Sequence, residues 1–202
     1  MPKRDLSLSL LASLLTAAFL LPTLINTGSY EAIAYAPILL FVAFPVVAVT
    51  GMSVSYFLGK RLRVLWQLGK FGLVGVLNTA IDFGILNSLI FVTKITGGVG
   101  IIPLNIISFS TAIINSYFWN KKWVFGVNKA SFVVFVVVTL IGLGINTGVV
   151  YFLTTFVSPI IVNSDTLWAN FAKVLATLLS LVWNFAGYRL IVFKKKEAVL
   201  KA

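Results

Sequence analysis

The sequence predicts an all-α integral membrane protein with six transmembrane helices. Of its 202 residues, 59% are hydrophobic and only 10% are charged, whereas soluble domains carry about 25% charged residues. The apolar residues fall in runs of roughly the 20 residues that an α-helix needs to cross a bilayer, joined by short polar or basic loops. We therefore expect one membrane domain, with no separate soluble catalytic domain.

The first two spans form an N-terminal hairpin in residues 1–59. The first span covers Leu6–Asn26 and is longer than the apolar region of a signal peptide, so we expect it to be retained. The second covers Ala36–Leu58, and Pro45 inside it predicts a kink. The linker at 60–70 alternates four cations with apolar side chains. This pattern is typical of a segment at an anionic leaflet, or of one that only fixes orientation.

Four further spans fill residues 71–196, and a short tail (197–202) follows. These spans cover Phe71–Val92, Ile101–Trp119, Ala130–Phe156 and Leu167–Val192. With six spans, one side of the membrane collects all lysines and arginines except Lys94 and Lys173. Because basic loops stay on the inner side, we expect a multi-pass plasma-membrane protein with both termini in the cytoplasm.

The last four spans carry an internal repeat. The stretch Asn115–Phe125 returns as Asn184–Phe193, aligned at an offset of 68 residues. The same offset places Leu77-Asn78-Thr79 on Ile145-Asn146-Thr147. Each copy is a two-helix hairpin, so the pattern predicts two parallel repeats about an axis along the membrane normal.

These motifs are similar to those of the GtrA-like family, which includes the membrane domain of some dolichol-phosphate mannose synthases. The similarity covers residues 69–196. It rests on Lys70-Phe-Gly-Leu-Val-Gly75, Asn78, Asn120-Lys-Lys-Trp-Val-Phe125, Ala172-Lys173, Asn184-Phe185 and Tyr188-Arg189 before Val192-Phe193. The resemblance implies a role in cell-surface polysaccharide or protein glycosylation. It also implies handling of a polyprenyl-phosphate-linked sugar, by flipping it or by anchoring a glycosyltransferase.

Each repeated stretch lies where a helix leaves the membrane, and we call Asn115–Phe125 the first exit and Asn184–Phe193 the second exit. Both exits supply groups suited to a polyprenyl phosphate, whose phosphate lies at headgroup depth. The predicted lipid-phosphate ligands are Arg189, Lys121, Lys122, Lys194, Asn120 and Asn184. Arg189 alone offers a planar fork for bidentate phosphate contact, which favours the second exit as the phosphate site. The alternative is that basic residues beside aromatic belts merely terminate membrane helices.

A second polar set lies inside the spans. It comprises Asp82, Lys173, Asn78, Asn105 and Asn146. A charge in lipid costs a few kcal/mol, so these side chains should face the bundle, where they predict a path for a sugar-phosphate head. The alternatives are an Asp82–Lys173 ion pair and interhelical hydrogen bonds from the asparagines.

The sequence has no cysteine and no histidine, which excludes thiol nucleophiles, imidazole catalysis and Cys/His metal sites. We expect no catalytic residues, no metal, no cofactor and no nucleic-acid partner. The predicted function is binding and flipping of an undecaprenyl- or dolichyl-phosphate-linked sugar by a non-enzymatic protein. The alternatives are a membrane anchor for a glycosyltransferase and a solute transporter that uses Asp82. The sequence leaves open whether the protein forms a homo-oligomer.

Overall fold

The structure is a computed structural model that describes residues 1–26, 29–95, 101–127, 129–157, 175 and 178–194. All regular secondary structure among these residues is helical, and no strand occurs among them, so the predicted all-α class is confirmed. The chain divides into two compact units, Met1–Gly126 and Val127–Ala202. We describe each unit by itself.

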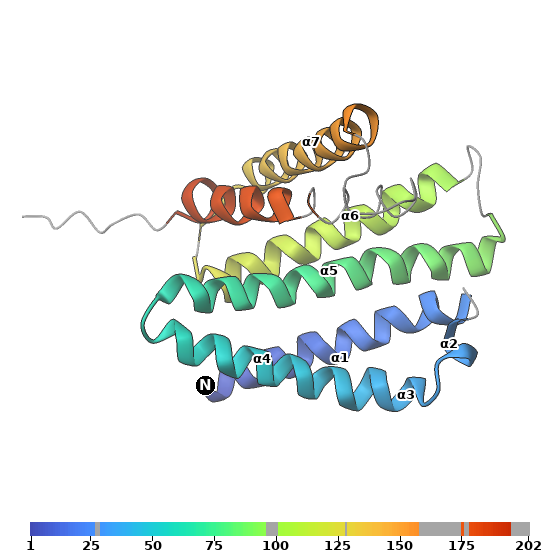
Figure 1. Cartoon of the computed structure of the whole chain (residues 1–202), viewed down its shortest axis with the longest axis horizontal. Helices are drawn as coiled ribbons and strands as arrows, with labels where there is room; N and C mark the ends of the chain where they lie inside the picture. Colours follow the sequence, from blue (N-terminus) through green and yellow to red (C-terminus); the bar gives the residue numbers. More distant parts are fainter. Residues whose placement is uncertain (27–28, 96–100, 128, 158–174, 176–177, 195–202) are drawn as a thin grey trace, which may run out of the picture. The chain divides into compact units, whose positions relative to one another are not determined.

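Unit 1 is an antiparallel arrangement of long helices (Figure 1). They are α1 (Lys3–Asn26), the continuous α3–η1–α4 rod (Ala36–Ile38, Leu39–Ala43 and Phe44–Gly59), α5 (Arg63–Thr93), and α6 (Ile101–Trp119) with its π-helical turn η2 (Asn120–Val124). The short helix α2 (Ser29–Ala32) follows α1. The start of α1, the α4–α5 turn and η2 lie at the same end of this unit. We call it the basic end, because it carries Lys3, Arg4, Lys60, Arg61, Arg63, Lys70, Lys121 and Lys122.

Helix α1 packs along α5 through a stripe of small side chains. Ser9, Ala12, Ser13, Thr16 and Ala17 are all fully buried. Small residues let two helix backbones approach closely, which is how membrane helices gain van der Waals contact. On α5, a Cβ at Gly84 would overlap the carbonyl group of Phe19, so this crossing requires glycine. The N-terminal hairpin is therefore an integral part of unit 1.

Two sequence expectations take a different local form in this unit. The kink predicted at Pro45 stays a prediction, but a π-helical turn, η1, ends at Ala43, two residues before Pro45 on the same rod. Proline has no N–H to donate, so a wider turn before it accommodates the lost hydrogen bond. Helix α5 begins at Arg63. Residues 63–70 of the expected linker are thus the first two turns of a membrane helix.

Unit 2 contains α7 (Phe132–Phe156) and an apolar helix, Leu178–Val192, that ends in the π-helical turn η3 (Tyr188–Val192). Both π-helical turns end alike: Phe125 N–H donates to Asn120 O, and Phe193 N–H donates to Tyr188 O. The turns η2 and η3 lie 68 residues apart, the offset of the sequence repeat. π-Helical turns are rare, so this agreement supports duplication of the two exits.

Three helices among the described residues are long and apolar enough to cross a membrane. They are α1, the α3–η1–α4 rod and α5, and they match the first three predicted spans. Helix α6 has the predicted bounds. The count of six spans stays a prediction.

Candidate functional site

A buried charge cluster joins α1, α5 and η2 at the basic end of unit 1. Asp5 Oδ1 lies 2.7 Å from Lys70 Nζ, with the two side chains 15% and 10% exposed. Trp123 Nε1 donates to the same oxygen at 2.7 Å. The Lys70 ammonium also lies over the rings of Trp66, at 4.6 Å, and Trp123, at 5.4 Å. Every charge in the cluster thus has close partners, as a buried ion pair needs for stability.

A groove of about 280 Å³ lies beside this cluster, between α1 and the α6–η2 helix end. Its lining residues are Arg4, Leu8, Leu11, Phe118, Trp119, Lys122 and Trp123. On α1, positions 4, 8 and 11 share one helix face. On α6–η2, a lysine accompanies three aromatic rings, two of which, Trp119 and Trp123, meet edge to face with centroids 5.4 Å apart. We call this feature the α1–η2 groove.

The α1–η2 groove is positively charged at one end and apolar along its length. Arg4 and Lys122 are both exposed, and no carboxylate lines the groove. The nearest acid in sequence, Asp5, is committed to Lys70 and Trp123. Leu11 and Phe118 are 47% and 48% exposed, so the walls are open to the surroundings of the helices. An anion attached to an apolar chain would match this distribution of positive charge and apolar surface.

The structure assigns different surroundings to the three residues predicted at the first exit. Lys122 lines the groove and lies 5.7 Å from the Phe118 ring centroid. Lys121 is half-buried and lies over Tyr117. Asn120 is buried, and its amide donates to Ser116 O and Ser116 Oγ, at 2.8 and 3.2 Å. Its donors are therefore used within the helix, while its Oδ1 has no hydrogen-bond partner among the described residues.

The second exit has an aromatic interior. Tyr188 stacks on Phe135 with ring centroids 4.6 Å apart, and its hydroxyl forms a 2.6 Å hydrogen bond with the Thr139 hydroxyl. The predicted ligands Arg189 and Lys194 are exposed. Asn184 lies against Gly142, where a Cβ would overlap its amide, and its Oδ1 is buried with no partner among the described residues.

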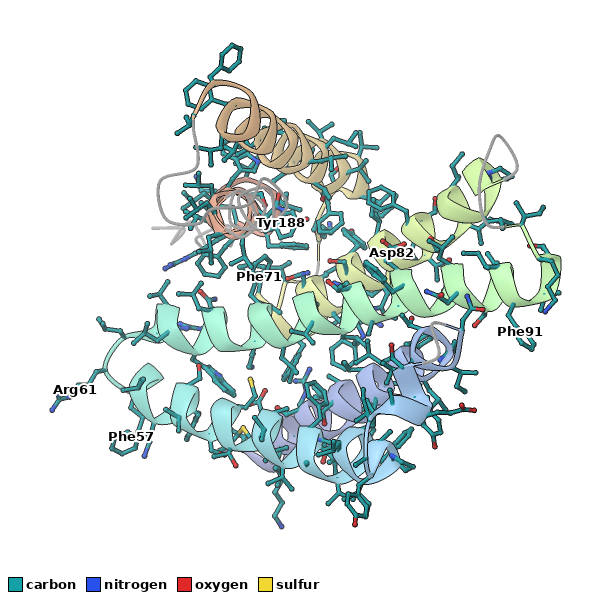
Figure 2. All side chains as sticks on the ribbon, turned by 45° about the vertical axis from the view of Figure 1, so that its right-hand side comes forward. Phe57, Arg61, Phe71, Asp82, Phe91 and Tyr188 are labelled. Carbon is teal, nitrogen blue, oxygen red and sulfur yellow. The ribbon has the colours of Figure 1, made fainter. Side chains whose placement is uncertain are left out.

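The intramembrane polar residues pair α5 with α6. Ser108 Oγ donates to Asp82 Oδ1 at 2.8 Å, and Asn115 Nδ2 donates to Asn78 Oδ1 at 2.7 Å. Figure 2 shows Asp82 on α5, on the side that faces α6. Asn78 thus makes an interhelical hydrogen bond, which the sequence predicts as the alternative to a role in a polar path. Lys173 and the side chains of Asn105 and Asn146 lie outside the described residues.

The GtrA/DPMS transmembrane domain family matches residues 70–193, more than half of the chain. The chain belongs to this family. A relative, the uncharacterized membrane protein YngA of Bacillus subtilis (strain 168), is 32% identical over 130 residues, which cover 62% of this chain and 78% of YngA. No solved structure matches the chain. The GtrA/DPMS match indicates a membrane protein of glycan biosynthesis.

The matched GtrA/DPMS region contains only one wall of the α1–η2 groove. Phe118, Trp119, Lys122 and Trp123 lie within residues 70–193, but Arg4 and the rest of the α1 wall precede them. The match begins at Lys70, which pairs with Asp5 from outside it. The N-terminal hairpin thus contributes one wall of the groove and the acid of the ion pair at the basic end of unit 1.

Sequence reasoning counted Arg4 only as an orientation signal and gave Asp5 no role. It placed Lys70 in the basic linker and in the family motif but not in an ion pair. One signal was present: Asp5 is an acid in a strongly basic segment that starts a membrane helix. Lone acids there need a cation, but nothing in the sequence identifies Lys70 among the basic residues as that partner.

Proposed function

We propose that this protein binds a polyprenyl-phosphate-linked sugar and assists its translocation across the membrane, without being an enzyme. The observation that carries the proposal is the α1–η2 groove, which combines the cations Arg4 and Lys122 with an apolar, aromatic wall. A polyprenyl phosphate has the matching parts, a phosphate at headgroup depth and a long apolar tail. Family membership supports the glycan context of this ligand.

The proposal includes a membrane arrangement. The basic end lies at the cytoplasmic leaflet of the plasma membrane, as the distribution of lysines and arginines predicts. Six spans and two parallel two-helix repeats complete the domain, supported by the shared offset of η2 and η3. At the second exit, Arg189 and Lys194 offer further exposed cations for phosphate.

Translocation would use the polar residues between α5 and α6. Asp82 with Ser108 and Asn78 with Asn115 form two polar contacts at different depths of unit 1. A sugar head that exchanged hydrogen bonds with these pairs would avoid complete desolvation in the bilayer. The sequence also assigns Lys173, Asn105 and Asn146 to a polar path, and their role in it stays a prediction.

A liposome experiment tests the proposal. The purified protein is reconstituted with a fluorescent polyprenyl-phosphate sugar, and the fraction accessible to an external quencher or reductant is followed in time. We expect faster exchange between leaflets than in empty liposomes, and slower exchange for the Asp82→Asn variant than for the exposed-site control Lys129→Gln. Exchange no faster than in empty liposomes would reject translocation.

The second candidate is a non-catalytic anchor for a glycosyltransferase, and one observation favours it. The described polar groups of the path, Asp82 and Asn78, are already hydrogen-bonded to neighbouring helices, as structural groups would be. The anchor predicts stable co-purification with a glycosyltransferase and tolerance of Asp82→Asn in that interaction. The liposome result and the co-purification result therefore separate the two functions.

A further inference from the structure

We propose that the N-terminal helix α1 completes the lipid-phosphate site, with Arg4 as a direct phosphate ligand and Asp5 as a positioning residue for Trp123. The occupant is a polyprenyl phosphate, so this inference rests on the proposed function. It goes beyond that function because it assigns the head to one groove and to residues that precede the matched family region.

Position on the helices is the first support. Arg4, Leu8 and Leu11 follow one face of α1 from its basic start into the apolar span. From position 4 to position 11 this face descends about 10 Å, at 1.5 Å per residue. A head held at Arg4 would therefore leave its tail beside Leu8 and Leu11, with Phe118 and Trp119 opposite.

Charge is the second support. Arg4 and Lys122 come from opposite walls and are not neutralised by any carboxylate that lines the groove. Lys70 does not add to them, because Asp5 holds it 2.7 Å away in a pair that is largely buried. The groove thus presents two cations from two helices, an arrangement that a single phosphate group can bridge.

The hydrogen bond of Trp123 is the third support. Its ring forms part of the groove wall, and its Nε1 donates to Asp5 Oδ1 at 2.7 Å. The residue next to the phosphate ligand Arg4 therefore fixes the orientation of the opposite wall. Without that acceptor the indole loses the hydrogen bond that holds it against α1.

The ligand arm of the test compares cations that line the groove with cations of the basic end that do not. Binding of a polyprenyl monophosphate to the full chain in detergent is titrated by native mass spectrometry, with the polyprenol that lacks phosphate as blank. We expect Arg4→Gln and Lys122→Gln each to weaken binding at least tenfold. The exposed lysines of Lys3→Gln and Lys60→Gln lie at the same basic end but do not line the groove, so both variants should stay within twofold of wild type.

The positioning arm compares two double variants that both lack the ion pair. Asp5→Asn with Lys70→Met keeps a carbonyl oxygen for Trp123, whereas Asp5→Ala with Lys70→Met removes it. We expect the first to bind within about twofold of wild type and the second to bind several-fold more weakly. The ¹⁵N-indole chemical shift of Trp123 should move further in the second, which has lost the acceptor, than in the first, and thermal unfolding confirms that both are folded.

The outcomes separate this inference from the proposed function. Wild-type binding that is unaffected by Arg4→Gln and Lys122→Gln, or reduced equally by all four substitutions, would overturn the groove while leaving the function. Equal affinity for phosphatidic acid would overturn the polyprenyl occupant. Equal binding by the two double variants would remove the role of Asp5. No binding of polyprenyl phosphate by the wild type would overturn both the function and the site.

Discussion

The two helix ends that carry π-helical turns are built from different side chains. At η2, the Trp123 indole and carbonyl meet the Asp5–Lys70 ion pair, whose acid comes from α1. At η3, Tyr188 stacks on Phe135 and hydrogen-bonds to Thr139, both from α7. The same backbone feature thus contacts an ion pair whose acid comes from the N-terminal hairpin in one case, and packs against aromatic residues of its own hairpin in the other.

The difference also appears at corresponding positions of the sequence repeat. Offset by 68 residues, Lys70 corresponds to Val138 and Asn120 corresponds to Tyr188. The first exit has a buried charge paired with α1, and the groove with two cations lies beside it. The second exit has an apolar and an aromatic residue at the two equivalent positions.

The largest expected effect comes from removing the lysine of the first exit. Lys70→Ala leaves Asp5 buried and uncompensated, and breaking such a pair costs about 3–5 kcal/mol of stability. The corresponding substitution at the second exit, Val138→Ala, should cost about 0.5–3 kcal/mol as most core changes do. Thermal unfolding in detergent checks the order. A smaller shift for Lys70→Ala than for Val138→Ala would contradict the importance of the ion pair.

An intermediate effect is expected where α1 crosses α5. Gly84→Ala forces a Cβ into the Phe19 carbonyl, and overpacking of this kind costs about 1–3 kcal/mol. Gly75→Ala on the same helix is the matched control, because its Cβ meets nothing within 4 Å. The control should be neutral or slightly stabilising, since alanine is the better helix former by about 1 kcal/mol. Similar unfolding temperatures for the two variants would show that α1 does not dock as described.

The smallest effect is expected at the second exit. Tyr188→Phe removes one hydrogen bond and keeps the stacked ring, a loss of about 1 kcal/mol. The Thr139 hydroxyl keeps its 2.9 Å hydrogen bond to the Phe135 carbonyl in this variant, so adding Thr139→Val should change stability little further. Thermal unfolding of the single and double variants measures this. A double variant that is much less stable than the single one would show that the Thr139–Phe135 hydrogen bond also stabilises the helix end.

The helices of the fold were largely predictable because membrane helices are recognised by the length and composition of their apolar runs. The bounds of α1, the α3–η1–α4 rod and α6 follow the apolar runs closely. The start of α5 was harder to predict. By composition, Arg63–Lys70 resembles a basic linker, but these residues form the first turns of the helix because Lys70 has a buried partner.

The site was only partly predictable. Lys122 was predicted from its exit motif and lines the groove, whereas Arg4 was counted only as an orientation signal. The donors of Asn120 were predicted to face a ligand, but Ser116 one turn earlier takes them. Such outcomes depend on which helices become neighbours, and a periodic apolar pattern does not encode that choice. The predicted ligand roles of Arg189, Lys194 and Asn184 stay predictions.

The hydroxyl groups in the α1 stripe have a consequence for biogenesis. Ser9, Ser13 and Thr16 each donate to a carbonyl of their own helix, at 2.7, 2.9 and 2.8 Å. Helix α1 is synthesised well before α5, and its hydroxyls need no partner from another helix while it waits in lipid. Helix α1 can therefore enter the bilayer with these three hydroxyls already hydrogen-bonded within the helix. Asp5 still needs a cation at that stage, and the cation arrives when Lys70 emerges.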